Sequence, residues 1–198
     1  MNIILIGASG RIGSELAIYL LKMGYDLALG DIDTKFIKSK LDALPEFTDR
    51  KVFIQDLDMC SEEQYKEWIN DANSYFGRID GAINCSYPRG KNYGAKLENV
   101  SLDDFNNNVS LHLGSYFNFL NITSSFMKIN LLEGSIVCTS SIYGHIAPKF
   151  SVYDDTDMTM PVEYAAVKSS INHLIRYFAS YYSGKGLRFN AVSPGGIL

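Results

Sequence analysis

Short apolar runs alternate with amphipathic stretches along almost the whole chain, and this alternation restricts the fold more than any other feature. The runs are rich in branched aliphatic residues, as buried strands are, and the stretches between them place apolar residues at helical spacing. Strands that alternate with helices form a parallel sheet with right-handed crossovers, so we predict a doubly wound α/β fold with helices on both faces. The predicted strands are residues 2–6, 26–30, 51–55, 79–84, 135–139 and 187–192.

Capping residues and helix breakers indicate where the helices begin and end. Ser61, with Gln64 three residues later, resembles a capping box, and Ser101 gives a similar signal. Asp33 or Thr34 is expected to cap a short helix that ends before Pro45. The predicted helices are residues 12–23, 34–44, 62–76, 102–129 and 162–182.

The composition excludes several classes of function. With 198 residues, 46% of them hydrophobic, the chain is long enough for one domain with one core, and its net charge of −4 argues against a nucleic-acid or anionic-membrane surface. Cys60, Cys85 and Cys138 are scattered, which favours reduced thiols in the cytoplasm over a disulfide framework or a zinc site. The apolar start is too short to cross a bilayer and lacks a basic flank, so we interpret it as a strand.

Three glycines, Gly7, Gly10 and Gly13, lie between the first predicted strand and the first predicted helix. Without side chains the backbone turns tightly there, and a pyrophosphate can approach the amides at the helix N-terminus, where the helix dipole favours negative charge. The sequence therefore predicts a dinucleotide site of the Rossmann type, and a purely structural glycine-rich turn is the alternative.

Asp31 follows the second predicted strand. A carboxylate at this place accepts hydrogen bonds from both ribose hydroxyls of adenosine and repels a 2′-phosphate, which favours NAD over NADP as the cofactor. Arg11 and Lys35 lie nearby in the sequence and would soften that preference. The alternative is that Asp31 only caps a turn.

Tyr164 and Lys168 are four residues apart at the start of a predicted helix, so their side chains point in the same direction. A phenol titrates at about pH 10 and is a poor acid or base at neutral pH, but a neighbouring cation lowers its pKa. Ser141 follows the fifth strand and brings a hydroxyl for the same substrate oxygen. We predict a proton-transfer site, although Tyr-x-x-x-Lys alone also describes an ordinary helix with a half-buried tyrosine.

The order of these features resembles that of the short-chain dehydrogenase/reductase family. The resemblance spans nearly the whole chain, and the ordered set of motifs is specific to that family. The segments that carry it are Gly7 to Gly13, Asp31, Asp56-Leu57, Ser141, Tyr164-x-x-x-Lys168 and Arg188 to Ile197.

The resemblance implies a role for each matching residue. Tyr164 would be the acid/base, Lys168 would hold the nicotinamide ribose and lower the pKa of the tyrosine, and Ser141 would orient the substrate oxygen. Pro194 and Gly195 would contact the nicotinamide. The implied cofactor-binding residues are Gly7, Ser9, Gly10, Arg11, Ile12, Gly13, Asp31, Asp56, Leu57, Asn84, Tyr164, Lys168, Pro194, Gly195 and Ile197.

Some positions depart from the family pattern. The even spacing of the glycines is typical of the extended, nucleotide-sugar branch, whereas Asn190 to Ile197 resembles the shorter dehydrogenase branch. The usual Asn-Asn-Ala-Gly after the fourth strand is replaced by Asn84-Cys85-Ser86-Tyr87, so only Asn84 carries over. His112 stands where many members have a proton-relay asparagine, and a histidine there would relay protons or be structural.

The chain ends at Leu198, whereas family members usually continue through a substrate-covering segment and a last strand. We therefore expect residues 1–198 to form one dinucleotide-binding domain that lacks the usual C-terminal segment.

The loop between Ser141 and Tyr164 is longer than is usual in the shorter branch, and its polar groups favour a hydrogen-bonding substrate; a solvated surface loop is the alternative. Ser141 to Gly144 and Pro161 to Tyr164 resemble sugar-active members of bacterial surface-glycan and flagellin-modification pathways. The charged and aromatic loop residues are His145, Lys149, Tyr153, Asp154, Asp155 and Asp157.

Together these patterns predict a cytoplasmic, NAD-dependent oxidoreductase that interconverts an alcohol and a ketone on a sugar or nucleotide sugar. The alternatives are a nucleotide-sugar epimerase or dehydratase that keeps its NAD bound, and a non-catalytic dinucleotide sensor. The apolar faces of the helices at 101–129 and 161–182 exceed what the sheet needs, and in the resembled family these helices pair, so we expect a homodimer or homotetramer.

Overall fold

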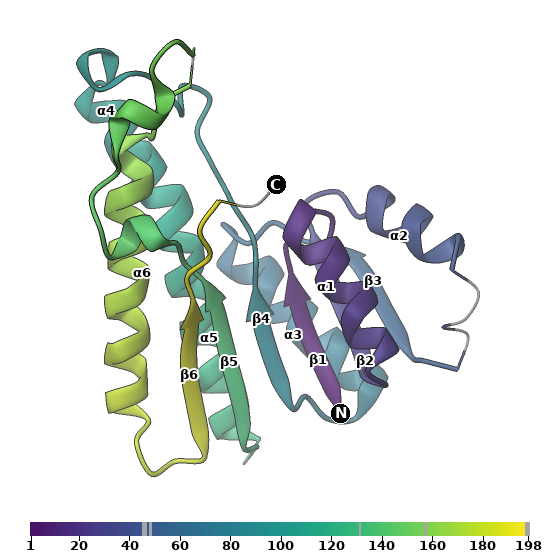
Figure 1. Ribbon diagram of the computed structural model, residues 1–198. Helices are drawn as coiled ribbons and strands as arrows, with labels where there is room; N and C mark the ends of the chain where they lie inside the picture. Colours follow the sequence, from purple (N-terminus) through teal and green to yellow (C-terminus); the bar gives the residue numbers. More distant parts are fainter. Residues whose placement is uncertain (45–46, 48, 131, 157, 197–198) are drawn as a thin grey trace.

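The computed structural model describes residues 1–44, 47, 49–130, 132–156 and 158–196, and it contains the predicted parallel sheet (Figure 1). The sheet has six strands in the order β3-β2-β1-β4-β5-β6, and every neighbouring pair is parallel. The predicted strands and the doubly wound fold are thus confirmed. The strands are β1 (Asn2–Ile6), β2 (Asp26–Asp31), β3 (Val52–Asp56), β4 (Gly81–Asn84), β5 (Gly134–Thr139) and β6 (Leu187–Val192).

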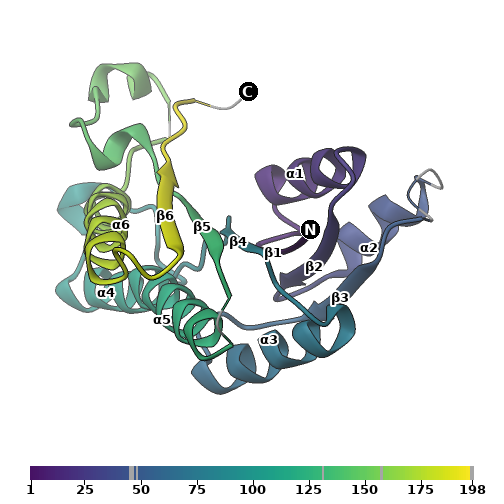
Figure 2. The same cartoon turned by 90° about the horizontal axis from the view of Figure 1, so that it is seen from below.

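Helices cover both faces of the sheet (Figure 2). The helices α1 (Arg11–Lys22) and α2 (Lys35–Asp42) lie on one face, and α3 (Glu62–Phe76), α5 (Gly114–Ile129) and α6 (Val162–Tyr181) lie on the other. Side chains of β1 alternate between the two cores: Leu5 packs in the cluster with α1, whereas Ile4 and Ile6 pack in the cluster with α3, α5 and α6. None of the described helices is both long and apolar enough to cross a membrane.

The predicted caps are largely confirmed. Ser61 Oγ accepts a hydrogen bond from the backbone N–H of Gln64 at 3.3 Å, and Ser101 Oγ accepts one from the backbone N–H of Asp104 at 3.0 Å. At the start of α2 the Asp33 carboxylate accepts from the Lys35 amide at 2.9 Å. Pro45 lies outside the described residues.

The helix predicted over residues 102–129 is present, but it is not α-helical throughout. A π-helical turn, Val109–Leu113, separates α4 (Leu102–Asn108) from α5. Asn108, at the end of α4, is buried against the loop after β4, and Tyr116 on α5 is buried against the sheet. A π-turn is wider than an α-turn, so it changes the rotation between Asn108 and Tyr116 and lets each residue meet its own partner. The even helical spacing of the sequence could not indicate this turn.

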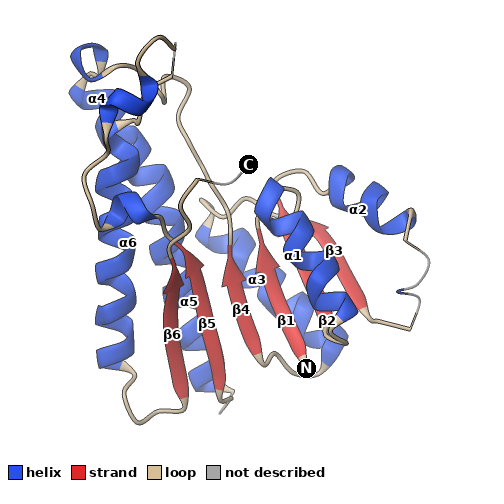
Figure 3. Cartoon of the chain, viewed as in Figure 1, coloured by secondary structure: helices blue, strands red, loops and turns tan. Residues whose placement is uncertain are grey.

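All strands run in the same direction, so their carboxyl ends lie at one edge of the sheet (Figure 3). The glycine turn after β1, Asp31, the loop after β4 and the segments after β5 and β6 therefore meet there. Ser140 N–H donates to the Val192 carbonyl at 2.7 Å and Ile142 N–H to the Pro194 carbonyl at 3.0 Å, which binds the segments after β5 and β6 together. Ligands of such sheets bind at this edge.

Candidate active site

Two adjoining cavities lie at the carboxyl edge of the sheet. The larger has a volume of about 510 Å³, and the smaller of about 140 Å³. Of the predicted site residues, Gly7, Ser9, Gly10, Asp31 and Leu57 line the larger cavity, and Ile12, Tyr164, Lys168, Pro194 and Gly195 line the smaller one.

The glycine turn wraps closely around the start of α1. Gly7 has a φ of +79°, and a Cβ at this position would lie 2.6 Å from the backbone of Cys85 and Ser86. A Cβ on Gly13 would lie 2.0 Å from the Gly7 carbonyl oxygen. Only glycine fits at both positions, so the sequence pattern reflects a packing requirement that brings the N-terminus of α1 to the larger cavity.

Asp31 lies at the end of β2 and lines the larger cavity. One carboxylate oxygen accepts a hydrogen bond from the Ser9 backbone N–H and the other from the Ile32 backbone N–H, both at 2.8 Å. These bonds fix the carboxylate beside the glycine turn, and each oxygen keeps a lone pair for a further donor. Asp31 therefore caps a turn and faces the cavity at the same time.

Other predicted cofactor residues lie outside the two cavities. Asp56 is engaged at the start of α2, where its Oδ1 accepts from the Thr34 amide at 3.0 Å and the Thr34 hydroxyl at 2.5 Å. The hydrogen bonds with Thr34 lower the pKa of Asp56. Asn84 is buried, and its Oδ1 accepts from the backbone N–H and the hydroxyl of Ser86. Ile197 and the loop residue Asp157 lie outside the described residues.

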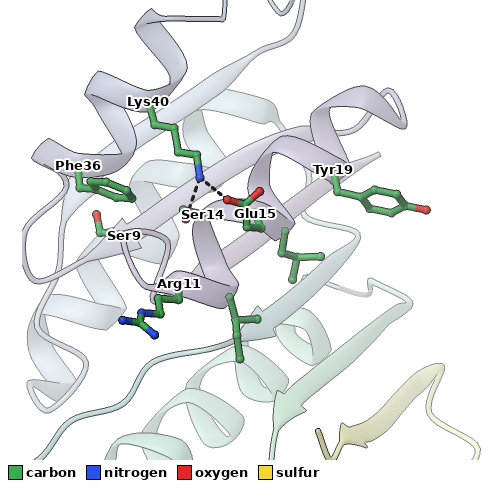
Figure 4. A pocket seen from close by; sticks show the side chains of 9 residues that line it. Ser9, Arg11, Ser14, Glu15, Tyr19, Phe36 and Lys40 are labelled. Atoms are coloured by element: carbon green, nitrogen blue, oxygen red, sulfur yellow. Dashed lines mark hydrogen bonds and ion pairs between the residues drawn. The ribbon is translucent and has the colours of Figure 1, made fainter. Parts of the chain in front are cut away.

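The Arg11 side chain lines a separate groove between α1 and α2, with a volume of about 940 Å³ (Figure 4). The aromatic rings of Tyr19 and Phe36 line this groove, and Lys40 crosses it to reach Glu15 at 2.6 Å. Arg11 therefore lines the outer groove and not the cavity of about 510 Å³ at the carboxyl edge. Ser9 lines both the groove and that cavity.

Tyr164 and Lys168 occupy the first turns of α6 and lie on the same side, as predicted. The Lys168 Nζ lies 5.6 Å from the centroid of the Tyr164 ring and donates to the Thr139 carbonyl at 2.9 Å. Lys168 is only 3% exposed, and this burial lowers its pKa to about 8. A buried ammonium beside a phenol stabilises the phenolate form and so favours proton transfer at moderate pH.

The two serines after β5 have different surroundings. Ser140 lines the smaller cavity, and its hydroxyl donates to the Lys168 carbonyl at 3.1 Å. Ser141, the residue predicted to orient the substrate, is 4% exposed and accepts from the Tyr143 backbone N–H at 3.2 Å. Ser141 is thus held next to the cavity, while Ser140 forms part of its wall.

His112 lies in the π-helical turn and is 3% exposed. Burial lowers its pKa to about 3, so the imidazole is neutral over the usual pH range. Its Nε2 has no hydrogen-bond partner among the described residues, and its ring lies against Tyr87 at a centroid distance of 4.8 Å. His112 therefore lies behind Tyr87, and its predicted role as a relay stays a prediction.

Sequence reasoning did not assign a role to Tyr87, although it lines both cavities. Its ring meets the Tyr164 ring at a centroid distance of 5.7 Å, and its hydroxyl shares a hydrogen bond with Tyr93. Burial raises the pKa of Tyr87 well above its usual range and that of Tyr93 to about 12, so both phenols stay neutral. The signal in the sequence was the departure from Asn-Asn-Ala-Gly after the fourth strand.

The residues at this edge fit a nicotinamide dinucleotide. Gly7 and Gly10 line the larger cavity at the N-terminal end of α1, and Asp31 presents a fixed carboxylate to the same cavity. A site of this kind binds an anion at the helix and hydroxyls at the acid. Tyr164 and Lys168 then supply a proton-transfer group beside the second cavity.

Comparisons with known proteins agree with this fit. A family profile described as Enoyl-(Acyl carrier protein) reductase matches residues 7–198. The Post-translational flagellin modification protein A of Campylobacter coli is 32% identical over 199 residues, which cover 99% of this chain and 77% of the relative.

Solved structures share the fold across nearly the whole chain. A short chain dehydrogenase from Leptospira borgpetersenii serovar Hardjo-bovis (strain JB197) with bound NAD⁺ has a TM-score of 0.82 and 25% identity, over 100% of this chain and 71% of that one. An NAD⁺-bound xylitol dehydrogenase has a TM-score of 0.83 and 25% identity, over 98% and 69%. The chain therefore belongs to the short-chain dehydrogenase/reductase family of NAD(P)-dependent oxidoreductases.

Proposed function

We propose that this oxidoreductase uses NAD to interconvert an alcohol and a ketone on a polar, sugar-derived substrate, with Tyr164 as the acid/base. One observation carries the proposal: the cavity that holds Tyr164 and Lys168 adjoins the cavity that holds Asp31 and the glycine turn. A dinucleotide that spans both would bring its reactive end next to the phenol, which is the positioning that hydride transfer requires.

In the oxidative direction, the Tyr164 phenolate takes the proton of the substrate hydroxyl, and a dinucleotide held between Asp31, the glycine turn and Lys168 would supply the hydride acceptor. The Lys168 ammonium stabilises the phenolate and would hold the nicotinamide ribose. Ser141 orients the substrate oxygen, and reduction reverses each step. The residues proposed to contact the cofactor are Gly7, Ser9, Gly10, Asp31 and Leu57 of the larger cavity and Ile12, Tyr164, Lys168, Pro194 and Gly195 of the smaller one. Asp56 is proposed to act indirectly, by holding Thr34 at the start of α2.

The aromatic hydroxyls around Tyr164 support a polyol or sugar as the substrate. Tyr143 lies beside Tyr153, and a hydrogen bond with Tyr143 raises the pKa of Tyr153 to about 12, so its hydroxyl remains a donor. Tyr93 and Tyr87 add two further neutral hydroxyls. Aromatic faces with polar edges suit the mixed surface of a sugar ring, and the names of the flagellin-modification and xylitol dehydrogenase relatives agree with this class.

The test is a screen for coenzyme turnover with xylitol, sorbitol and nucleotide sugars, with cyclohexanol as the apolar comparison. We expect turnover of NAD with at least one polyhydroxylated compound and little with cyclohexanol. Equal or better turnover of cyclohexanol would contradict the substrate class.

We expect NADH to bind more tightly than NADPH because Asp31 would repel a 2′-phosphate. Replacing Asp31 by Asn should weaken NADH binding by about tenfold, since a charged hydrogen bond is lost, and should reduce the discrimination against NADPH. The measurement is fluorescence titration with both coenzymes. Asp71→Asn, which removes an exposed carboxylate on α3, is the matched control and should leave both affinities unchanged. Equal binding of the two coenzymes by the unaltered protein would contradict the assignment.

We also propose that the protein is a homodimer or homotetramer that pairs through α5 and α6. Phe117, Tyr177 and Tyr181 are 50%, 62% and 57% exposed and line a surface groove of about 790 Å³. Tyr177→Asp should shift the sedimentation coefficient towards that of a monomer, because it places a charge in an apolar interface. Tyr19→Asp, an equally exposed tyrosine on α1, is the control. A monomeric unaltered protein would refute the proposal.

The even spacing of Gly7, Gly10 and Gly13 favours a second candidate, an epimerase or dehydratase of nucleotide sugars that retains its NAD. NAD that remains with the purified protein and is not consumed during turnover would favour this candidate.

The three free cysteines agree with a reducing compartment, and we propose that the protein acts in the cytoplasm.

A further inference from the structure

Tyr87 is placed between the two cavities and touches the groups that flank them. It is 36% exposed, and its ring meets the edges of Tyr164 and His112. The Lys168 ammonium lies 5.7 Å from the centroid of the Tyr87 ring, and the Arg89 guanidinium lies 5.8 Å from it. The ring therefore forms part of the boundary between the two cavities, together with Cys85 and Ser86.

The position of this ring is fixed from two directions. The Tyr87 hydroxyl shares a hydrogen bond with the Tyr93 hydroxyl, and the two rings meet edge to face at 5.7 Å. The loop that carries both is tied to α4, because the Gly90 N–H donates to Asn108 Oδ1 at 2.7 Å.

Asn108 extends the same connection to α6. Its Nδ2 donates to the Glu163 carboxylate at 3.3 Å, and Glu163 is 1% exposed and directly precedes Tyr164. A Cβ on Gly90 would lie 2.5 Å from the Asn107 Nδ2, so a larger residue there would have to displace the Asn107 side chain. The loop, the end of α4 and the start of α6 thus hold one another, and Tyr87 is held relative to Tyr164.

We infer that Tyr87 is a positioning residue that holds the nicotinamide riboside end of the dinucleotide against Tyr164, and that Tyr93 holds Tyr87 in place. The inference rests on the proposed dinucleotide site. A flat aromatic ring at the boundary offers a stacking surface to the ring or the ribose of the ligand, and base–aromatic stacking is a substantial source of affinity. The adenosine and pyrophosphate would be held by Asp31 and the glycine turn, which also line the larger cavity, and so would not depend on this ring.

The experiment compares NADH with ADP, which lacks the nicotinamide riboside end, by titration of the purified protein. For Tyr87→Ala we expect NADH binding to weaken about tenfold or more, because the stacking surface is lost. ADP binding should stay within about twofold, a change too small to represent a lost contact. Tyr75→Ala, an exposed tyrosine on α3, is the matched control and should change neither affinity.

Two conservative variants guard against misfolding of the alanine variant. Tyr87→Phe and Tyr93→Phe each remove the same hydrogen bond, so both should weaken NADH binding by the same factor of about threefold. The double variant should be no worse than either single one, because the bond can be lost only once.

The outcomes separate this inference from the proposed function. Equal weakening of NADH and ADP, unchanged NADH binding, or additive effects of the two phenylalanine variants would overturn the inference and leave the dinucleotide site intact. Tighter NADH binding by Tyr87→Ala would also overturn it, since the ring would then obstruct the cofactor. Failure of the unaltered protein to bind either ligand would overturn the proposed function, and the inference with it.

Discussion

Replacing Tyr164 by Phe is expected to lower the turnover number by about a thousandfold, because it removes the only group proposed to exchange a proton with the substrate. The change deletes one hydroxyl and keeps the ring that packs against Tyr87. NADH should still bind with nearly the same affinity, since Asp31 and the glycine turn are untouched. The loss should therefore fall on the turnover number and leave coenzyme affinity unchanged.

The measurements are the steady-state rate with whichever polyol or nucleotide sugar is turned over, and the NADH dissociation constant by titration. Tyr75→Phe removes a hydroxyl from an exposed tyrosine far from the carboxyl edge and serves as the control. A Tyr164→Phe variant that retains more than about a tenth of the rate would exclude Tyr164 as the acid/base, because general acid–base catalysis contributes roughly a hundredfold or more.

Replacing Lys168 by Met is expected to lower activity and raise stability together. Without the ammonium the Tyr164 phenolate loses its neighbouring cation and proton transfer becomes less effective, so the rate should fall by roughly a hundredfold. The folded protein should nevertheless become more stable at neutral pH, because the charged form of a side chain that is 3% exposed no longer has to be buried.

The lowered pKa of Lys168 determines whether this stability difference grows or shrinks with pH. The pKa of Lys168 is lowered from 10.5 to about 8 by burial, so between these values the unfolded chain binds more protons than the folded one. The free energy of unfolding of the unaltered protein should therefore rise relative to that of Lys168→Met as the pH increases from about 8 towards 10.5. Thermal melts of both proteins over this range, together with rates at each pH, measure both consequences. A Met variant that is less stable at pH 7 would show that Lys168 is stabilised in its charged form.

The fold was predictable because its signals are local and repeated. The strand periodicity, the caps at Ser61 and Ser101, and the glycine turn each report a backbone requirement that is visible in neighbouring residues. The grouping of Asp31, Tyr164 and Lys168 at one edge followed from the rule that parallel strands end together.

The contacts that the sequence did not indicate join separate segments. Asp56 was predicted beside the cofactor, and its Oδ1 also accepts two hydrogen bonds from Thr34 of another connection. Tyr87 is held by Tyr93 of the same loop, and that loop is held by Asn108 of α4. Side chains that are oriented by partners far along the chain leave no periodic mark in the sequence.

The π-helical turn between α4 and α5 makes the length of this segment a constraint of its own. Each residue of an α-helix advances the chain by about 100° around the axis, and a π-turn already takes up one residue more than an α-turn, so inserting a further residue in 109–113 would rotate one half of the helix against the other. Either Asn108 would leave Gly90 and Glu163, or Tyr116 would leave the carbonyls of Ser86 and Thr139. An insertion in these five residues would therefore separate the loop after β4 and the start of α6 from the contacts that α5 makes with the sheet.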